Sequence, residues 1–139
     1  AMGALEEGPD LMPETGDRRI TIRAGDVTID GQLNDSPTAD LLWEALTIKA
    51  AANTWGDEIY FSIPVSAEGD DTAQETVDLG AIAYWPPGSA LCLFFGLTPM
   101  SQGDEIRPAS AVNVLGMMEG DSTVLRSVQP GTVVEVSRA

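Results

Sequence analysis

Aromatic residues that carry a polar atom are the side chains of this sequence best suited to forming a binding site. Most aromatic residues gather in two segments, Trp55 to Phe61 and Tyr84 to Phe95. Tryptophan and tyrosine favour half-buried positions with the polar end in water, which suits the wall of a pocket. Trp85 directly precedes Pro86-Pro87-Gly88, and we expect this rigid turn to hold its ring at the rim of the fold.

Core packing is the alternative role for these aromatic side chains. Phe94 and Phe95 are consecutive, so in a strand they point to opposite faces and only one of them needs to lie in the core. The residue types alone leave open whether each ring lines a pocket or packs inside. The aromatic residues that we predict to line a pocket are Trp55, Tyr84, Trp85 and Phe95.

Polar residues that follow the second aromatic segment add possible ligand contacts. Arg107 is a rare base in a strongly acidic chain, and its guanidinium can bind a carboxylate or phosphate through two parallel hydrogen bonds. The alternative is an ion pair with Asp104 or Glu105. Ser110 and Asn113 can orient a ligand, or they can cap a turn and hold loop backbone. We include Arg107, Ser110 and Asn113 in the predicted ligand-binding set.

The sequence gives little support for catalysis or for a metal site. It contains no histidine, which excludes a serine–histidine–aspartate mechanism and removes the usual zinc ligands. Its one cysteine, Cys92, lies in the apolar run 90–95, which favours a buried thiol that packs like a small hydrophobic residue. The adjacent acids Asp57 and Glu58 point opposite ways in a strand, so they do not form an acid–base pair. Catalytic residues stay unassigned, and we predict no metal and no cofactor.

Charge and hydropathy narrow the classes of partner. The 139 residues hold 22 acids against 7 bases, a net charge of −15, which repels phosphate backbones and anionic membranes. No stretch approaches the roughly 18 apolar residues of a transmembrane helix, and the start lacks the pattern of a signal peptide. We therefore expect a cytoplasmic protein that binds neither nucleic acid nor a membrane.

The elements that must position these residues are mainly short strands. Alternating residues on either side of Gly25-Asp26 predict a β-hairpin with Ile20, Ile22, Val27 and Ile29 on the core face. Further strands are predicted at 48–52, 58–64, 81–85, 91–95, 112–118 and 132–136. Ser36 as a cap and Pro37 at the first helical position predict a helix that covers one end of the fold, and a helical turn is expected near 122–127.

Seven or eight short strands with one clear helix predict an all-β barrel or sandwich. Residues 1–17 have the composition of an expression remnant and an acidic flexible tail. Residues 18–139 are expected to form one domain.

Three segments resemble the cyclophilin-like family of small prokaryotic proteins of unknown function. They begin at Trp55-Gly56-Asp57-Glu58-Ile59-Tyr60-Phe61, at Ala83-Tyr84-Trp85-Pro86-Pro87-Gly88 and at Arg107-Pro108-Ala109-Ser110. The second segment continues into Leu93-Phe94-Phe95-Gly96-Leu97-Thr98-Pro99-Met100-Ser101, and the resemblance covers roughly 19–137. It implies a closed cyclophilin-like β-barrel and leaves the activity open.

The function expected at this point is binding of a small molecule or an extended peptide in a pocket at the barrel rim. A peptidyl-prolyl isomerase is the enzymatic alternative that the fold suggests. Cyclophilins use an arginine in a Phe-Met-x-Gln-Gly-Gly setting, and this sequence has no such segment, while Arg23 falls in no matching motif. A protein-interaction module, with a possible homodimer through a strand edge, is the third alternative.

Overall fold

Strands are the main regular elements of the structure. The computed structural model describes residues 18–139, and the predicted tail, residues 1–17, lies outside the described residues. The strands are β2 (Arg19–Ala24), β3 (Val27–Leu33), β4 (Ile48–Ala51), β5 (Asn53–Thr54), β6 (Glu58–Ser62), β7 (Ala73–Gln74), β8 (Ala81–Trp85), β9 (Ala90–Phe94), β10 (Val112–Met118) and β11 (Val133–Arg138). The helices are α2 (Pro37–Ala45) and the 3-10 helices η1 (Pro86–Gly88) and η2 (Ser122–Ser127).

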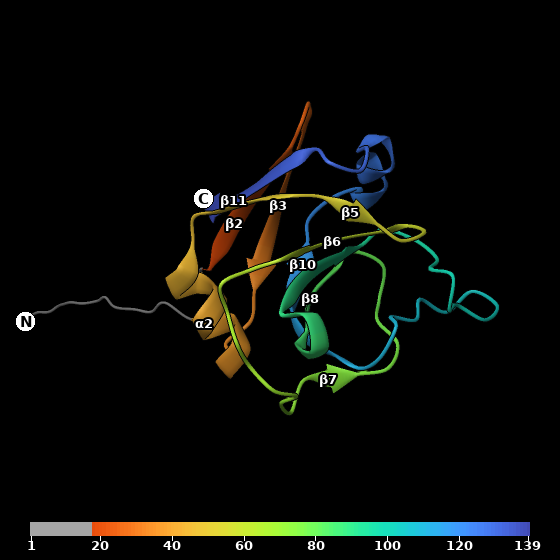
Figure 1. Ribbon diagram of the computed structural model, residues 1–139, viewed down its shortest axis with the longest axis horizontal. Helices are drawn as coiled ribbons and strands as arrows, with labels where there is room; N and C mark the ends of the chain where they lie inside the picture. Colours follow the sequence, from red (N-terminus) through yellow and green to blue (C-terminus); the bar gives the residue numbers. More distant parts are fainter. Residues whose placement is uncertain (1–17) are drawn as a thin grey trace, which may run out of the picture.

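The strands close on themselves into a barrel. Their order is β4-β11-β2-β3-β10-β8-β9-β6-β5, with β7 paired to β10. The two end strands, β4 and β5, are separated only by Ala52, whose N–H donates to the carbonyl of Thr132 at 2.8 Å. One nearly continuous stretch of chain therefore joins the two edges, and Figure 1 shows the resulting barrel. The predicted cyclophilin-like β-barrel architecture is confirmed.

The amino-terminal hairpin and the helix form where the sequence predicts them. β2 and β3 pair antiparallel around Gly25, which turns with a positive φ of 59°. α2 begins after Ser36, whose Oγ accepts a hydrogen bond from the N–H of Ala39 at 3.3 Å. Ala39 and Leu42 are buried and pack into the barrel, so the helix is held by this one face. Among residues 18–139, no helix has the length and hydropathy needed to cross a membrane.

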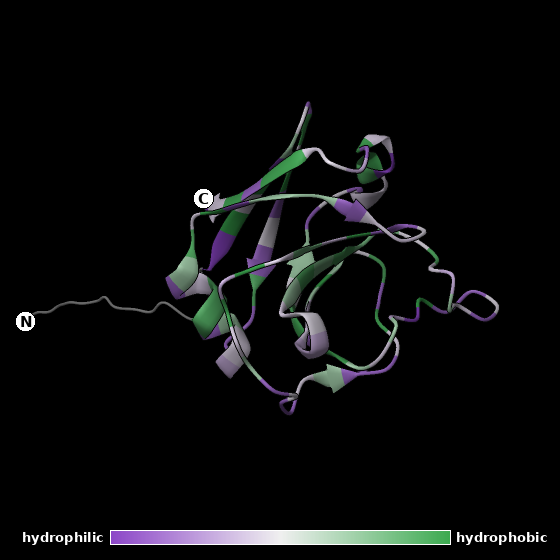
Figure 2. Ribbon diagram, in the orientation of Figure 1, coloured by the Kyte–Doolittle hydropathy of each residue, from purple (hydrophilic) through white to green (hydrophobic). Residues whose placement is uncertain are grey.

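Two hydrophobic clusters lie on the two faces of the sheet. The inner cluster fills the barrel and includes Ile22, Phe61 and Leu115. The outer cluster lies on the other face of β8, β9 and β10; its buried members are Val77, Ala81, Ala83, Cys92, Phe94, Ile106 and Val112. Figure 2 shows hydrophobic residues along these strands and hydrophilic residues in many of the connecting loops.

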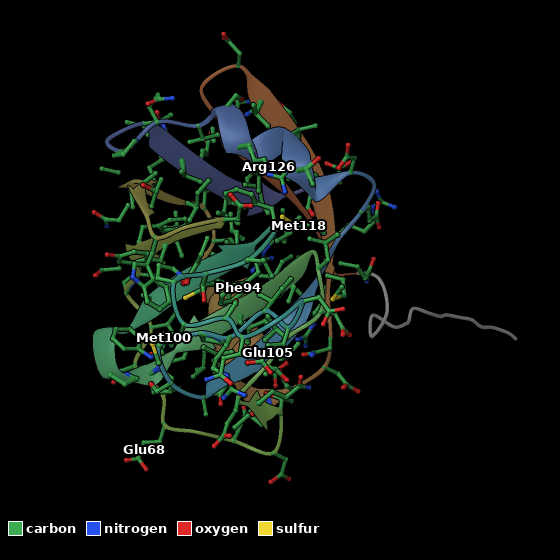
Figure 3. All side chains as sticks on the ribbon, turned by 90° about the vertical axis from the view of Figure 1, so that its right-hand side faces the viewer. Glu68, Phe94, Met100, Glu105, Met118 and Arg126 are labelled. Atoms are coloured by element: carbon green, nitrogen blue, oxygen red, sulfur yellow. The ribbon has the colours of Figure 1, made fainter. Side chains whose placement is uncertain are left out.

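The outer cluster is buried because the loop 95–111 lies over it. Ile106 of this loop forms an isolated β-bridge with Val77 and packs in the outer cluster together with Phe94. Figure 3 looks onto this side of the molecule and labels Phe94 of β9 together with Met100 and Glu105 of the loop. Both Phe94 and Phe95 are therefore buried, one in each cluster.

Candidate functional site

A pocket of about 260 Å³ opens on the outer face of the barrel, beside the outer cluster. We call it the outer pocket; its lining residues are Trp55, Glu58, Tyr60, Trp85, Cys92, Pro108, Ala109 and Val112. Alternation along β6 explains the part that this strand contributes. Glu58 and Tyr60 point to the outer face, whereas Ile59 and Phe61 point into the inner cluster.

Three half-buried aromatic rings form the walls of the outer pocket: Trp55, Tyr60 and Trp85. The Trp85 ring is fixed from two sides. Its Nε1 donates to the Oγ of Ser110 at 2.7 Å, and a Cβ added to Gly88 would lie only 2.8 Å from its Cε3 and Cζ3 atoms. Only glycine at position 88 leaves room for this ring, so the turn after β8 sets the position of the wall.

Glu58 is the charged side chain among the lining residues. It is only 5% exposed, and among the residues that the structure describes its Oε1 has no hydrogen-bond partner. Burial raises the pKa of Glu58 to about 7, and a hydrogen bond with the Cys92 thiol opposes this rise. Its neighbour Asp57 faces elsewhere, with its Oδ2 3.3 Å from Nη2 of Arg126. The two adjacent acids therefore have separate environments, as predicted.

Cys92 is a buried thiol beside this carboxyl group. Burial, followed by the charge of Glu58 and its hydrogen bond, raises the pKa of Cys92 well above its usual value. The single thiol proton has two acceptors within reach, the Glu58 carboxyl and the carbonyl oxygen of Ala90, at 3.9 Å from Sγ. A thiol held in the protonated form is a poor nucleophile. The arrangement suits a polar contact inside an apolar pocket rather than covalent chemistry.

Of the predicted site residues, the structure brings three together. Trp55 and Trp85 line the outer pocket, and Ser110 lies behind Trp85 as its hydrogen-bond acceptor. Ser110 thus positions a wall of the pocket and is not itself among the lining residues.

Tyr84 and Phe95 lie in the inner cluster, away from the outer pocket. The Tyr84 hydroxyl donates to the carbonyl of Val65 at 2.7 Å and accepts from the N–H of Ala67 at 3.2 Å. These bonds attach the segment that follows β6 to the barrel. Tyr84 therefore acts in packing and in holding a loop.

Asn113 is fully buried and joins three parts of the chain. Its Nδ2 donates to Thr38 Oγ1 at 3.0 Å and to the carbonyl of Glu68 at 2.9 Å, and its Oδ1 accepts from the N–H of Asp70 at 3.0 Å. These contacts agree with the alternative in which Asn113 holds loop backbone.

Arg107 pairs with acids of the surrounding segments. Its Nε lies 2.6 Å from Glu105 Oε2, and its Nη1 lies 4.0 Å from Glu75 Oε1. Hydrogen bonding and the charge of Glu105 raise the pKa of Arg107, and the same contact lowers the pKa of Glu105. Arg107 therefore forms the ion pair that was the alternative to ligand binding, and it is not among the lining residues of the outer pocket.

Several lining residues of the outer pocket lie outside the site that the sequence predicts, namely Glu58, Tyr60, Cys92, Pro108, Ala109 and Val112. The alternation of Glu58, Tyr60 and Ser62 against apolar neighbours was visible, but a polar strand face ordinarily meets solvent. Within residues 18–139, no group of three or more histidine, cysteine, aspartate or glutamate residues is placed to hold a metal ion.

Comparison with known proteins identifies the relatives of this barrel. The sequence model of the family described as Cyclophilin-like matches residues 18–137. The chain is 41% identical to a hypothetical protein from Archaeoglobus fulgidus whose solution structure superposes with a TM-score of 0.79, covering 93% of this chain and 100% of that one.

A more distant likeness is to the structure of McbB in complex with tryptophan, with a TM-score of 0.64 and 17% identity over 86% of this chain and 44% of that chain. At this identity the likeness concerns the fold alone. No curated protein matches the chain. Barrel topology and the match over nearly all described residues lead to one conclusion: this chain belongs to the Cyclophilin-like family.

Proposed function

We propose that this cyclophilin-like domain binds a small, largely apolar molecule in the outer pocket. The observation that carries the proposal is a pocket of about 260 Å³ in which three half-buried aromatic side chains surround one buried carboxyl group. Ligand sites typically combine an apolar, aromatic lining with a few polar groups that fix orientation. Pockets for drug-sized ligands span roughly 300–1,000 Å³. This smaller volume favours a compact molecule over an extended peptide.

The walls of the outer pocket are organised before any ligand arrives. Ser110 and Gly88 hold the Trp85 ring, and the loop 95–111 is anchored on the barrel by Ile106. A rigid site loses little side-chain freedom on binding, so more of the apolar contact contributes to affinity.

Prolyl isomerisation has less support than binding. Among the described residues, no arginine lines the outer pocket. Arg23 lies on β2, where its Nη1 is 3.4 Å from Glu135 Oε1, and Arg107 is paired with Glu105. A homodimer through a strand edge is also less supported, because the two ends of the sheet, β4 and β5, are nearly continuous.

A thermal-shift screen of compact apolar molecules and short Xaa-Pro peptides tests the proposed function. A ligand at about one hundred times its Kd adds about 2.7 kcal/mol of stability, a shift of several degrees. We expect Trp85→Ala to weaken a hit at least tenfold, about 1.4 kcal/mol, because the ligand loses a wall of the pocket. Ser110→Ala, which only frees the ring, is expected to weaken binding by a smaller factor.

The matched control for this experiment is Trp43→Ala. Trp43 lies on α2 under the guanidinium of Arg138, 4.4 Å from the ring centroid, and is not among the pocket residues. We therefore expect Trp43→Ala to leave the affinity of a hit for the outer pocket unchanged. Hits that keep their affinity in both Trp85→Ala and Ser110→Ala would contradict the assignment of the outer pocket, and a shift with Xaa-Pro peptides alone would favour the isomerase alternative.

A further inference from the structure

We infer that the ligand of the outer pocket is a compact organic amine, with its ammonium group on Glu58 and its apolar body between Trp55 and Trp85. This inference rests on the proposed function and specifies its ligand class.

The unpartnered oxygen of Glu58 is the first observation behind it. The side chain lines the outer pocket, is 5% exposed, and has no partner for Oε1 among the described residues. Leaving a buried acceptor without a donor is costly, and native proteins satisfy nearly all such groups. A ligand with an N–H directed at Oε1 would supply the missing donor.

The surroundings of Glu58 favour a positive ligand over a negative one. Among residues 18–139, no lysine or arginine lines the pocket, so an anion would find no compensating charge beside the carboxylate. Aromatic rings attract cations through their faces, and the rings of Trp55, Tyr60 and Trp85 line the pocket. The net charge of −15 also raises the local concentration of cations around the protein.

Size and hydrogen bonding narrow the amine further. A protein cavity of about 150 Å³ holds benzene, so about 260 Å³ accommodates one ring with a short aminoalkyl chain. A quaternary ammonium has no N–H and would leave Oε1 unsatisfied. Primary or secondary amines of this size carry both the positive charge and the N–H donor that Oε1 lacks.

Amine binding should depend on pH through Glu58. The other ionisable groups that line the outer pocket are Cys92 of β9, which burial keeps protonated, and Tyr60 of β6, which carries no positive charge. Asp57 is paired with Arg126, and Arg107 is paired with Glu105. An alkyl ammonium stays charged, as lysine does with a pKa of about 10.4. With the pKa of Glu58 at about 7, amine affinity is expected to fall about tenfold from pH 8 to pH 6.

Three probes of matched shape test the inference: 2-phenylethylamine, 2-phenylethanol and 3-phenylpropanoate. In a Trp43→Phe chain the tryptophan fluorescence comes from Trp55 and Trp85, so titration reports directly on the outer pocket. At pH 8 we expect the amine to bind at least tenfold more tightly than the alcohol, and the propanoate to bind most weakly. Glu58→Gln should abolish the preference for the amine, whereas Asp57→Asn, the neighbouring acid that faces Arg126, should preserve it.

The outcomes separate the inference from the proposed function. If the alcohol binds as tightly as the amine, or the propanoate binds best, the amine inference is overturned and the outer pocket remains a binding site. If Asp57→Asn removes the preference as fully as Glu58→Gln does, general surface charge explains it and the inference is again overturned. If none of the three probes changes the fluorescence, the inference and the proposed function both fail.

Discussion

Replacing Glu58 with glutamine should stabilise the folded protein by about 3 kcal/mol above pH 7 and have little effect near pH 4.5. Folding moves the pKa of this carboxyl from 4.5 to about 7 because it is buried, and each pKa unit corresponds to about 1.4 kcal/mol. Glutamine keeps the shape of the protonated acid without the charge. The measurement is urea denaturation of both proteins at pH 4.5, 6 and 8.

The sign of this pH dependence follows from proton binding. Between pH 4.5 and 7 the folded protein holds the Glu58 proton more tightly than the unfolded chain does, so rising pH favours unfolding. The stability associated with the protonated carboxyl is fully present below pH 4.5 and is lost by about pH 7. Above that value both states are ionised, and the difference between wild type and variant becomes constant.

Asp57→Asn is the matched control, since it removes the neighbouring acid, whose partner is Arg126 at the surface. Comparing the two variants cancels the general effect of removing one negative charge from a protein with a net charge of −15. A Glu58→Gln protein whose stability relative to wild type is the same at pH 4.5 and pH 8 would contradict a buried carboxyl group with one unpartnered oxygen.

Removing the side chain of Asn113 should lower the free energy of unfolding by about 3 kcal/mol. Asn113→Ala breaks three hydrogen bonds and leaves the Glu68 carbonyl and the Asp70 N–H without this partner. Because Asn113 is fully buried, water cannot simply replace the lost amide. Chemical denaturation at a fixed pH measures the loss, and hydrogen exchange is expected to speed up first in the segment around Asp70.

Asn53→Ala provides the comparison for this prediction. Asn53 is exposed and makes one side-chain bond, from Nδ2 to the carbonyl of Tyr60 at 3.3 Å, so its removal should cost less than about 1 kcal/mol. Equal losses for the two variants would show that the Asn113 network contributes no more than an exposed contact.

The sequence predicts the strands and the helix well because their signals are local. β8 and β10 have the predicted bounds, Ala81–Trp85 and Val112–Met118, and α2 starts at the predicted Pro37 after its Ser36 cap. β5 and β7 are only two residues long, too short to show any alternation. Their pairing depends on neighbouring strands rather than on their own residues.

The face to which a side chain points was harder to predict. β8 is buried on both faces, so Tyr84 and Trp85 carry no alternating signal that tells the inner side from the outer. The turn at Pro86 predicts that the Trp85 ring lies at a rim of the fold. In the structure Trp85 lines the outer pocket, whereas Tyr84 lies in the inner cluster.

Glu58 shows the limit of local reasoning most clearly. Its place in an alternating strand correctly puts it on the face opposite to Ile59, but the pocket that it lines is completed by residues far away in sequence, including Pro108 and Ala109. The loop 95–111 has no periodic pattern that predicts where it lies. A carboxyl group that reads as solvent-exposed in the sequence thus becomes the main polar group of the candidate site.

The most direct test of the proposed amine site at Glu58 is an NMR titration of its side-chain carboxyl carbon, with and without saturating 2-phenylethylamine. We predict a pKa of about 7 for Glu58 in the free protein and a clear fall in this pKa when the ammonium group pairs with the carboxylate. A pKa near 4.5 in the free protein, or a value that the amine leaves unchanged, would contradict it.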